Sequence, residues 1–110
     1  MNKIAGLTKY KQSVVSNVIA LVAAEFSVQE KDLFTKSRAV RYSTPRSVAV
    51  GILRKFYGIQ YQILADYFGY VSHGSVAHAV KSVDDKINTD PDIKRIVQNI
   101  LHNVKQLKID

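Results

Sequence analysis

The chain has 110 residues, a length that suits one domain with a single hydrophobic core. Lysine and arginine number 16 against 9 acidic residues, and the formal net charge of +7 gives a long-range attraction to polyanions. Cysteine is absent, which excludes disulfide frameworks and thiolate metal sites and fits a reducing, intracellular compartment.

The first predicted helix contains the apolar run 14–24. Its spacing places four apolar side chains on one helical face: Val15, Ile19, Val22 and Phe26. The run is too short to span a bilayer and is interrupted by polar residues, so we interpret it as a core helix and not as a secretory signal. After it, Ser27 with Glu30 three positions later has the pattern of a capping box, which predicts a short helix through Leu33 and Phe34.

Both prolines of the chain follow a residue that can cap a helix. Thr44 before Pro45, and Asp90 before Pro91, each put an oxygen at the N-cap and proline at the first helical position. We therefore predict one helix from Pro45 to near Gly58, with the apolar stripe Val48, Ile52, Leu53 and Phe56. The other should run from Pro91 to the end of the chain, with the stripe Ile93, Val97, Ile100, Leu101, Val104 and Leu107.

Two further helical patterns, 61–68 and 75–88, are separated by the glycine-containing segment GYVSHG. In the longer pattern the apolar positions face inward, which turns His78, Lys81 and Asp85 toward solvent. A short helix, a turn and a second helix with small polar residues at its start is the layout of a helix-turn-helix. The predicted class is all-α: one helical domain of about six helices that contains a helix-turn-helix.

Between Leu33 and Ala65 there is no acidic residue. The cations in this interval are Lys36, Arg38, Arg41, Arg46, Arg54 and Lys55. Such a block is either an ordinary solvated face or the footprint of a polyanion.

The segment FGYVSHGSVAHAV, residues 68–80, holds two of the three histidines. No third group or oxyanion pocket accompanies its serines and histidines, so it does not predict a nucleophilic enzyme. His73 and His78 are five positions apart, which does not align them as metal ligands on a helix, and no phosphate-cradling GxxxxGK[ST] motif occurs. We expect no enzymatic activity, metal, cofactor or nucleotide. As a surface that reads DNA, the segment makes physical sense, because serine and histidine bond base edges or phosphates.

The order of motifs resembles the C-terminal DNA-binding domain of the bacterial chromosomal replication initiator DnaA. The resemblance runs through VAAEFSVQEKDLFTKSR, TPRSVAVGILRKF, QILADYFG and SHGSVAHAVKSV, with a looser continuation in DPDIKRIV. It is without gaps from about Val22 to Val83 and extends loosely to residue 107. The resemblance implies a helical domain whose helix-turn-helix binds duplex DNA at the initiator's recognition boxes.

The same resemblance implies roles for particular residues. Arg38 of the basic loop would enter the minor groove, and Arg46, after the proline, would touch the DNA backbone. Lys36 and Arg41 belong to the same basic loop, and Lys81 occupies a basic position on the recognition helix that can meet phosphate. The start of that helix would read bases through Ser72, His73, Gly74 and Ser75.

This chain departs from the family where bases are read. The family usually has an arginine and an aspartate before the histidine and a threonine after it, whereas this chain has Val71, Ser72 and Gly74. Each lost contact of this kind discriminates by about 1 to 3 kcal/mol, so we expect DNA binding to survive better than the preference for the usual box.

An initiator also needs an ATPase module, which the segment ahead of the match is too short to hold. The chain is then either a piece of a longer protein or a free-standing relative, and the start MNKIAGLTKYKQ and a last helix expected to reach Asp110 favour the free-standing relative. We expect residues 1–12 to be an N-terminal extension, and the domain to bind double-stranded DNA in the cytoplasm at the nucleoid and not at a membrane. An alternative is a protein-interaction module that kept the fold and lost DNA readout, with a surface formed by Tyr57, Tyr61, Tyr67 and Tyr70. Binding of structured RNA is a third possibility.

Overall fold

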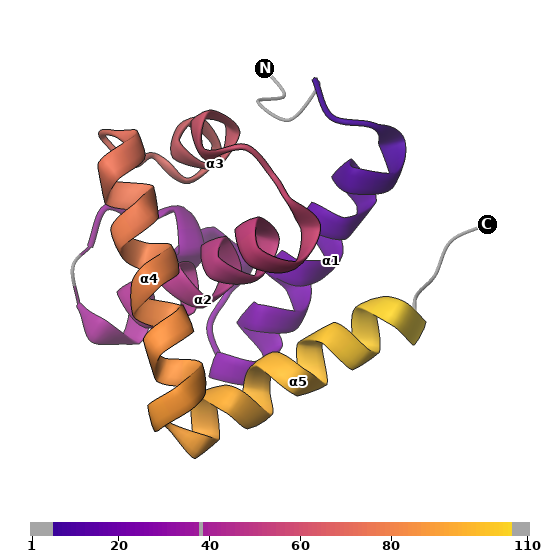
Figure 1. The fold of residues 1–110 in the computed structure, drawn as a ribbon, viewed down its shortest axis with the longest axis vertical. Helices are drawn as coiled ribbons and strands as arrows, with labels where there is room; N and C mark the ends of the chain where they lie inside the picture. Colours follow the sequence, from indigo (N-terminus) through magenta and orange to yellow (C-terminus); the bar gives the residue numbers. More distant parts are fainter. Residues whose placement is uncertain (1–5, 38, 107–110) are drawn as a thin grey trace.

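The computed structural model describes residues 6–37 and 39–106, and within these ranges it is entirely helical, without a strand. Five α-helices and one 3₁₀ helix, η1, follow one another along the chain (Figure 1). Their bounds are α1 (Lys9–Phe26), η1 (Glu30–Phe34), α2 (Val40–Tyr57), α3 (Tyr61–Phe68), α4 (His73–Thr89) and α5 (Pro91–Gln106). The prediction of an all-α domain of about six helical elements is therefore confirmed.

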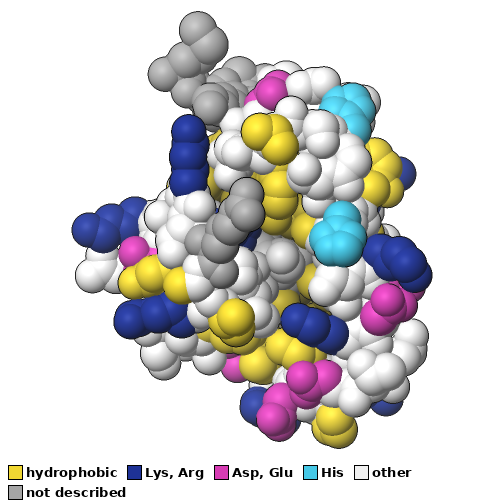
Figure 2. Space-filling view, turned by 90° about the vertical axis from the view of Figure 1, so that its left-hand side faces the viewer, with side chains coloured by type: hydrophobic (Ala, Val, Ile, Leu, Met, Phe, Trp, Pro, Cys, Tyr) yellow, Lys and Arg dark blue, Asp and Glu magenta, His cyan; other side chains and the backbone are white. Residues whose placement is uncertain are grey.

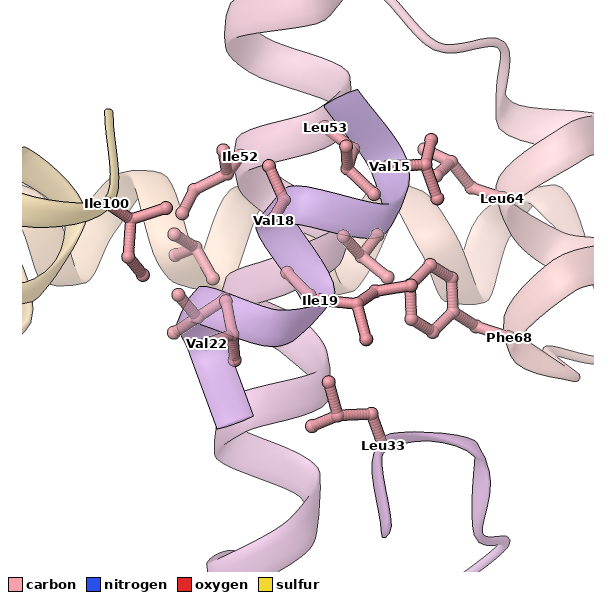
Figure 3. Packing of buried hydrophobic residues seen from close by; sticks show 14 of the residues in the cluster. Val15, Val18, Ile19, Val22, Leu33, Ile52, Leu53, Leu64, Phe68 and Ile100 are labelled. Carbon is pink, nitrogen blue, oxygen red and sulfur yellow. The ribbon is translucent and has the colours of Figure 1, made fainter. Parts of the chain in front are cut away.

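Helix α2 is the centre of the domain, because it packs against α1, η1, α3 and α4. Helix α5 then closes the core by packing against α1 and α4. Figure 3 shows side chains from α1 meeting those of α2, α3 and α5 in one cluster. Val22, Ile52 and Ile100 are fully buried there, as the apolar stripes of their helices predicted.

Helices α2 and α4 pack closely at Gly51. A Cβ atom added to Gly51 would lie 2.9 Å from Cβ of Val83, closer than packed carbon atoms sit. Glycine therefore allows α4 to lie directly against the middle of α2. This contact sets the position of α4, the second helix of the predicted helix-turn-helix, relative to the start of α2.

The predicted start of α2 at Pro45 was wrong, because the helix begins five residues earlier at Val40. The carbonyl of Ala39 accepts hydrogen bonds from the backbone N–H groups of Tyr42 and Ser43, both at 2.9 Å, and so begins the helix. Pro45 is buried within the second turn, where it costs one backbone bond because it has no N–H to donate.

The capping box predicted at Ser27 was also wrong. Ser27 ends α1 in the left-handed conformation, with φ of 56°, and its N–H donates to the carbonyls of α1's last turn. The capping box belongs to Gln29 and Asp32, two residues further on, and it starts η1. The short helix through Leu33 and Phe34 is present as predicted.

The later boundaries agree with the sequence. Asp90 caps α5, because its Oδ1 accepts from the backbone N–H groups of Asp92 and Ile93 at 3.0 and 3.3 Å. Two residues of the predicted apolar stripes are not confirmed as core residues. Phe56 is 43% exposed and lies off the core stripe of α2, and Leu107 lies outside the described residues.

Candidate nucleic-acid interface

The turn between α3 and α4 places the first turn of α4 at the surface. Gly69 ends α3 with φ of 75°, a left-handed conformation that glycine adopts without strain. Ser72 is the N-cap of α4, and its Oγ accepts from the backbone N–H of Ser75 at 3.2 Å. The first turn of α4 carries no acidic residue, so its exposed N–H groups and the helix dipole favour an anion at this end.

An open groove of about 670 Å³ lies between the start of α2 and α4, and we call it the α2–α4 groove. Hydroxyl groups dominate its lining: Ser43, Thr44, Ser47, Tyr70, Ser72, Ser75 and Ser82. The remaining lining residues are Arg46, Gly74, His78, Ala79 and Lys86. None of the described residues that line the groove is acidic, so it offers hydrogen-bond donors and positive charge to an anionic ligand.

Figure 2 views the molecule from the side on which α4 and the loop before α2 lie in Figure 1. Lysine, arginine and histidine side chains gather across this face, and acidic side chains lie mainly near its edges. The groove thus belongs to a broader basic surface, to which the loop before α2 contributes.

Arg46 holds that loop in place. Its guanidinium group donates one hydrogen bond to the carbonyl of Thr35 and another, of 3.1 Å, to the carbonyl of Ser37. Within the loop, the hydroxyl of Thr35 accepts from the N–H of Ser37, and the hydroxyl of Ser37 from the N–H of Ala39, each at 3.2 Å. One half-buried arginine therefore fixes the path of the chain around Lys36.

The structure brings together only some of the predicted site residues. Arg46, Ser72, Gly74 and Ser75 come together in the α2–α4 groove, as residues far apart in sequence. Lys36 and Arg41 are exposed and do not line the groove. Arg41 was expected in the basic loop but lies in the first turn of α2, where its guanidinium is 4.8 Å from the ring centroid of Tyr42. Arg38 lies outside the described residues.

His73 and Lys81 do not line the groove. His73 is exposed at the first position of α4, and its Nε2 lies 2.6 Å from Oε1 of Gln62 on α3. Lys81 lies on another face of α4, where its Nζ is 3.6 Å from a carboxylate oxygen of Asp85. There it lines a second, shallower hollow together with Arg54, Lys55 and Tyr61.

The sequence interpretation missed several groove residues: Ser43, Thr44, Ser47, His78, Ser82 and Lys86. On α4 the signal was present, because Ser75, Ala79, Ser82 and Lys86 recur at spacings of three and four, the pattern of one helix face. For the residues before Pro45 on α2 no helical pattern was considered, since the helix was expected to start only at Pro45.

The tyrosines proposed as an alternative protein-binding surface contribute to packing. All four are partly buried against the hydrophobic core. Tyr67 makes edge-to-face contacts with Phe34 and Phe68 at 5.2 and 5.3 Å, and burial, followed by the charge of Glu30, raises the pKa of Tyr67. The guanidinium of Arg54 lies 4.4 Å from the ring centroid of Tyr61.

Two features of the described residues bear on other functions. Residues 6–37 and 39–106 contain no group of three or more histidine, aspartate or glutamate side chains arranged to hold a metal ion. Across the same residues, no helix is both long and apolar enough to cross a membrane.

A short helix, a glycine turn and a second helix with an exposed first turn, packed on a central helix beside a basic loop, define a helix-turn-helix domain. Residues 15–83 match the family model described as the bacterial DnaA protein helix-turn-helix, which is more than half of the chain. The chain therefore belongs to the family of bacterial DnaA helix-turn-helix domains.

Several proteins named chromosomal replication initiator protein DnaA are similar to this chain. That of Nautilia profundicola is 28% identical over 99 residues, covering 88% of this chain and 23% of the relative. That of Treponema denticola is 24% identical over 106 residues, covering 96% of this chain and 23% of the relative. That of Geotalea uraniireducens is 28% identical over 92 residues, covering 84% of this chain and 20% of the relative. The chain thus spans less than a quarter of the length of these relatives.

Proposed function

We propose that this domain binds double-stranded DNA without enzymatic activity, in a role related to the recognition of replication-origin boxes. The observation that carries the proposal is the α2–α4 groove, where cationic and hydroxyl side chains from two helices converge without an acidic residue among the described lining. The names of the relatives, all chromosomal replication initiators, support the origin-related role. The same role implies a location at the nucleoid, in the cytoplasm.

In this proposal the groove and the loop hold the DNA backbone. Arg46 and Lys86 supply charge to phosphates, and the serine and threonine hydroxyls donate hydrogen bonds to phosphate oxygens. Lys36 in the loop and Arg41 in the first turn of α2 extend the positive surface, and Arg38 enters the adjacent minor groove. Lys81, on another face of α4, meets phosphate only where the duplex reaches beyond the groove.

The first turn of α4 then faces the major groove. Ser72 uses its Oγ to cap the helix, so its capacity to read a base is reduced. Gly74 is exposed and lets the DNA approach the helix backbone closely. Base contacts therefore fall mainly to His73 and Ser75.

The test is a titration of a fluorescein-labelled duplex that carries the initiator's recognition box, beside a scrambled duplex of equal composition, followed by anisotropy at several salt concentrations. The proposal predicts binding with a log–log salt slope of about −4 to −6, for some five or six neutralised phosphates. Tighter binding to the box at every salt concentration would support the origin-related role. Failure to bind either duplex at low salt would refute the proposed function.

A further inference from the structure

The side chain of His73 is joined to α3 by one hydrogen bond, and a second hydrogen bond within α3 continues from its partner. Nε2 of His73 lies 2.6 Å from Oε1 of Gln62, and Nε2 of Gln62 donates to Oδ1 of Asp66 at 2.9 Å. Gln62 and Asp66 are one turn apart on α3, and α3 packs directly against α4 (Figure 1). An exposed histidine in the predicted reading turn is therefore held by a neighbouring helix.

The chemistry of the three groups fixes the direction of both bonds. An ionised carboxylate only accepts hydrogen bonds, so the amide nitrogen of Gln62 must face Asp66. The amide oxygen of Gln62 then faces His73, and because this oxygen also only accepts, Nε2 of His73 must carry the proton. In a neutral ring with a proton on Nε2, Nδ1 has a lone pair and no proton.

We propose that Gln62 and Asp66 are positioning residues that hold neutral His73 in the Nε2–H tautomer, so that Nδ1 is the atom presented to DNA. This inference rests on the proposed function. An acceptor at Nδ1 pairs with the amino group of adenine or cytosine in the major groove. It does not pair with O6 or N7 of guanine, or with a phosphate oxygen, because these groups are acceptors themselves. The two hydrogen bonds from His73 through Gln62 to Asp66, which we call the relay, would thus give His73 a base preference.

The first arm of the test uses the free protein. Long-range ¹H–¹⁵N correlation spectra at about pH 8, where free imidazole is neutral, report the tautomer of each histidine. The signal of His73 is assigned by its loss in H73A, and exposed His78 is the internal reference.

We expect His73 to be entirely in the Nε2–H form in the unmodified protein and to shift toward the mixture shown by His78 in Q62L. D66N should also weaken the preference, because an asparagine at this position allows the amide of Gln62 to turn over. Q60L alters the exposed N-cap residue of the same helix, whose side chain makes no capping bond, and should leave the signal of His73 unchanged. The inference would be overturned if His73 showed the same tautomer mixture as His78 in the unmodified protein, or if Q62L left the tautomer of His73 unchanged.

The second arm measures binding to the recognition-box duplex in a double-mutant cycle. H73A should weaken binding by roughly 5- to 100-fold, and Q62L by roughly 2- to 10-fold, the cost of one oriented hydrogen bond. In the H73A background, Q62L should have no further effect, because Gln62 acts only through His73. Additive losses would contradict the positioning role. Absence of duplex binding by the unmodified protein would refute the proposed function instead, and the tautomer measurement would still decide whether the relay exists.

Discussion

Arg46 combines two functions: it holds the loop before α2 in place, and it supplies positive charge to the α2–α4 groove. Its guanidinium group donates to the carbonyls of Thr35 and Ser37, and it also lines the α2–α4 groove. Each hydrogen bond from a charged donor contributes about 1.5 to 3 kcal/mol where it is sheltered, and less at a half-exposed site such as this one. Together the two bonds should stabilise the observed conformation of the loop by about 1 to 3 kcal/mol. Removing these two bonds should therefore weaken DNA binding, because Lys36 and the rest of the loop would no longer be held in place.

The perturbation compares Arg46→Ala with Arg46→Lys. Alanine removes both the charge and the fork of donors, so R46A should weaken duplex binding by about 10- to 100-fold and reduce the magnitude of the salt slope by about 1. Lysine keeps the charge but not the planar fork that reaches two carbonyls, so R46K should restore the slope without restoring the affinity.

Anisotropy titrations at four or more salt concentrations measure both quantities, with Arg95→Ala, an exposed cation on α5, as the matched control. If R46K binds as tightly as the unmodified protein at every salt concentration, Arg46 acts as a charge alone. That result would refute its role in holding the loop.

Three further predictions concern stability and charge. Gly51→Ala should destabilise the fold by about 1 to 3 kcal/mol through its contact with Val83, measured by denaturant unfolding, whereas Gly74→Ala, whose added Cβ meets its nearest atom at 3.6 Å, should not. Asp90→Ala should cost about 0.5 to 2 kcal/mol by removing the cap of α5, and equal stability of this variant and the unmodified protein would disprove the cap. Lys86→Ala should reduce the magnitude of the salt slope by about 1 and weaken binding to the box and scrambled duplexes equally. A loss of affinity for the box duplex alone would count against a phosphate contact.

Periodicity predicted the helices and their buried faces because burial of an apolar stripe on α1, α4 or α5 depends only on local spacing. The start of α2 escaped prediction, since the pair Thr44–Pro45 has all the features of a helix start. The actual start depends on Ala39, whose side chain has no capping oxygen, and on a loop that Arg46 holds from the following helix. Tertiary contacts of this kind leave no local pattern.

The candidate site was predictable only in part, for the same reason. The motifs identified the first turn of α4 and the basic loop, but nothing local indicates that Ser47 of α2 and Ser82 of α4 line one groove. That arrangement depends on the close packing at Gly51. The relay from Asp66 through Gln62 to His73 was likewise invisible, because its members come from two helices whose relative position the turn sets.

The most direct test of the central claim is to map the duplex onto the protein with ¹H–¹⁵N chemical shifts. We predict that adding the recognition-box duplex shifts the backbone amides of the basic loop, of residues 43–47 except Pro45, which has no N–H, and of the first turn of α4, and leaves those of α5 near their free positions. Shifts confined to α5 or to the tyrosine-bearing surface, with residues 43–47 and 72–75 unchanged, would contradict the assignment of the α2–α4 groove as the DNA-binding surface.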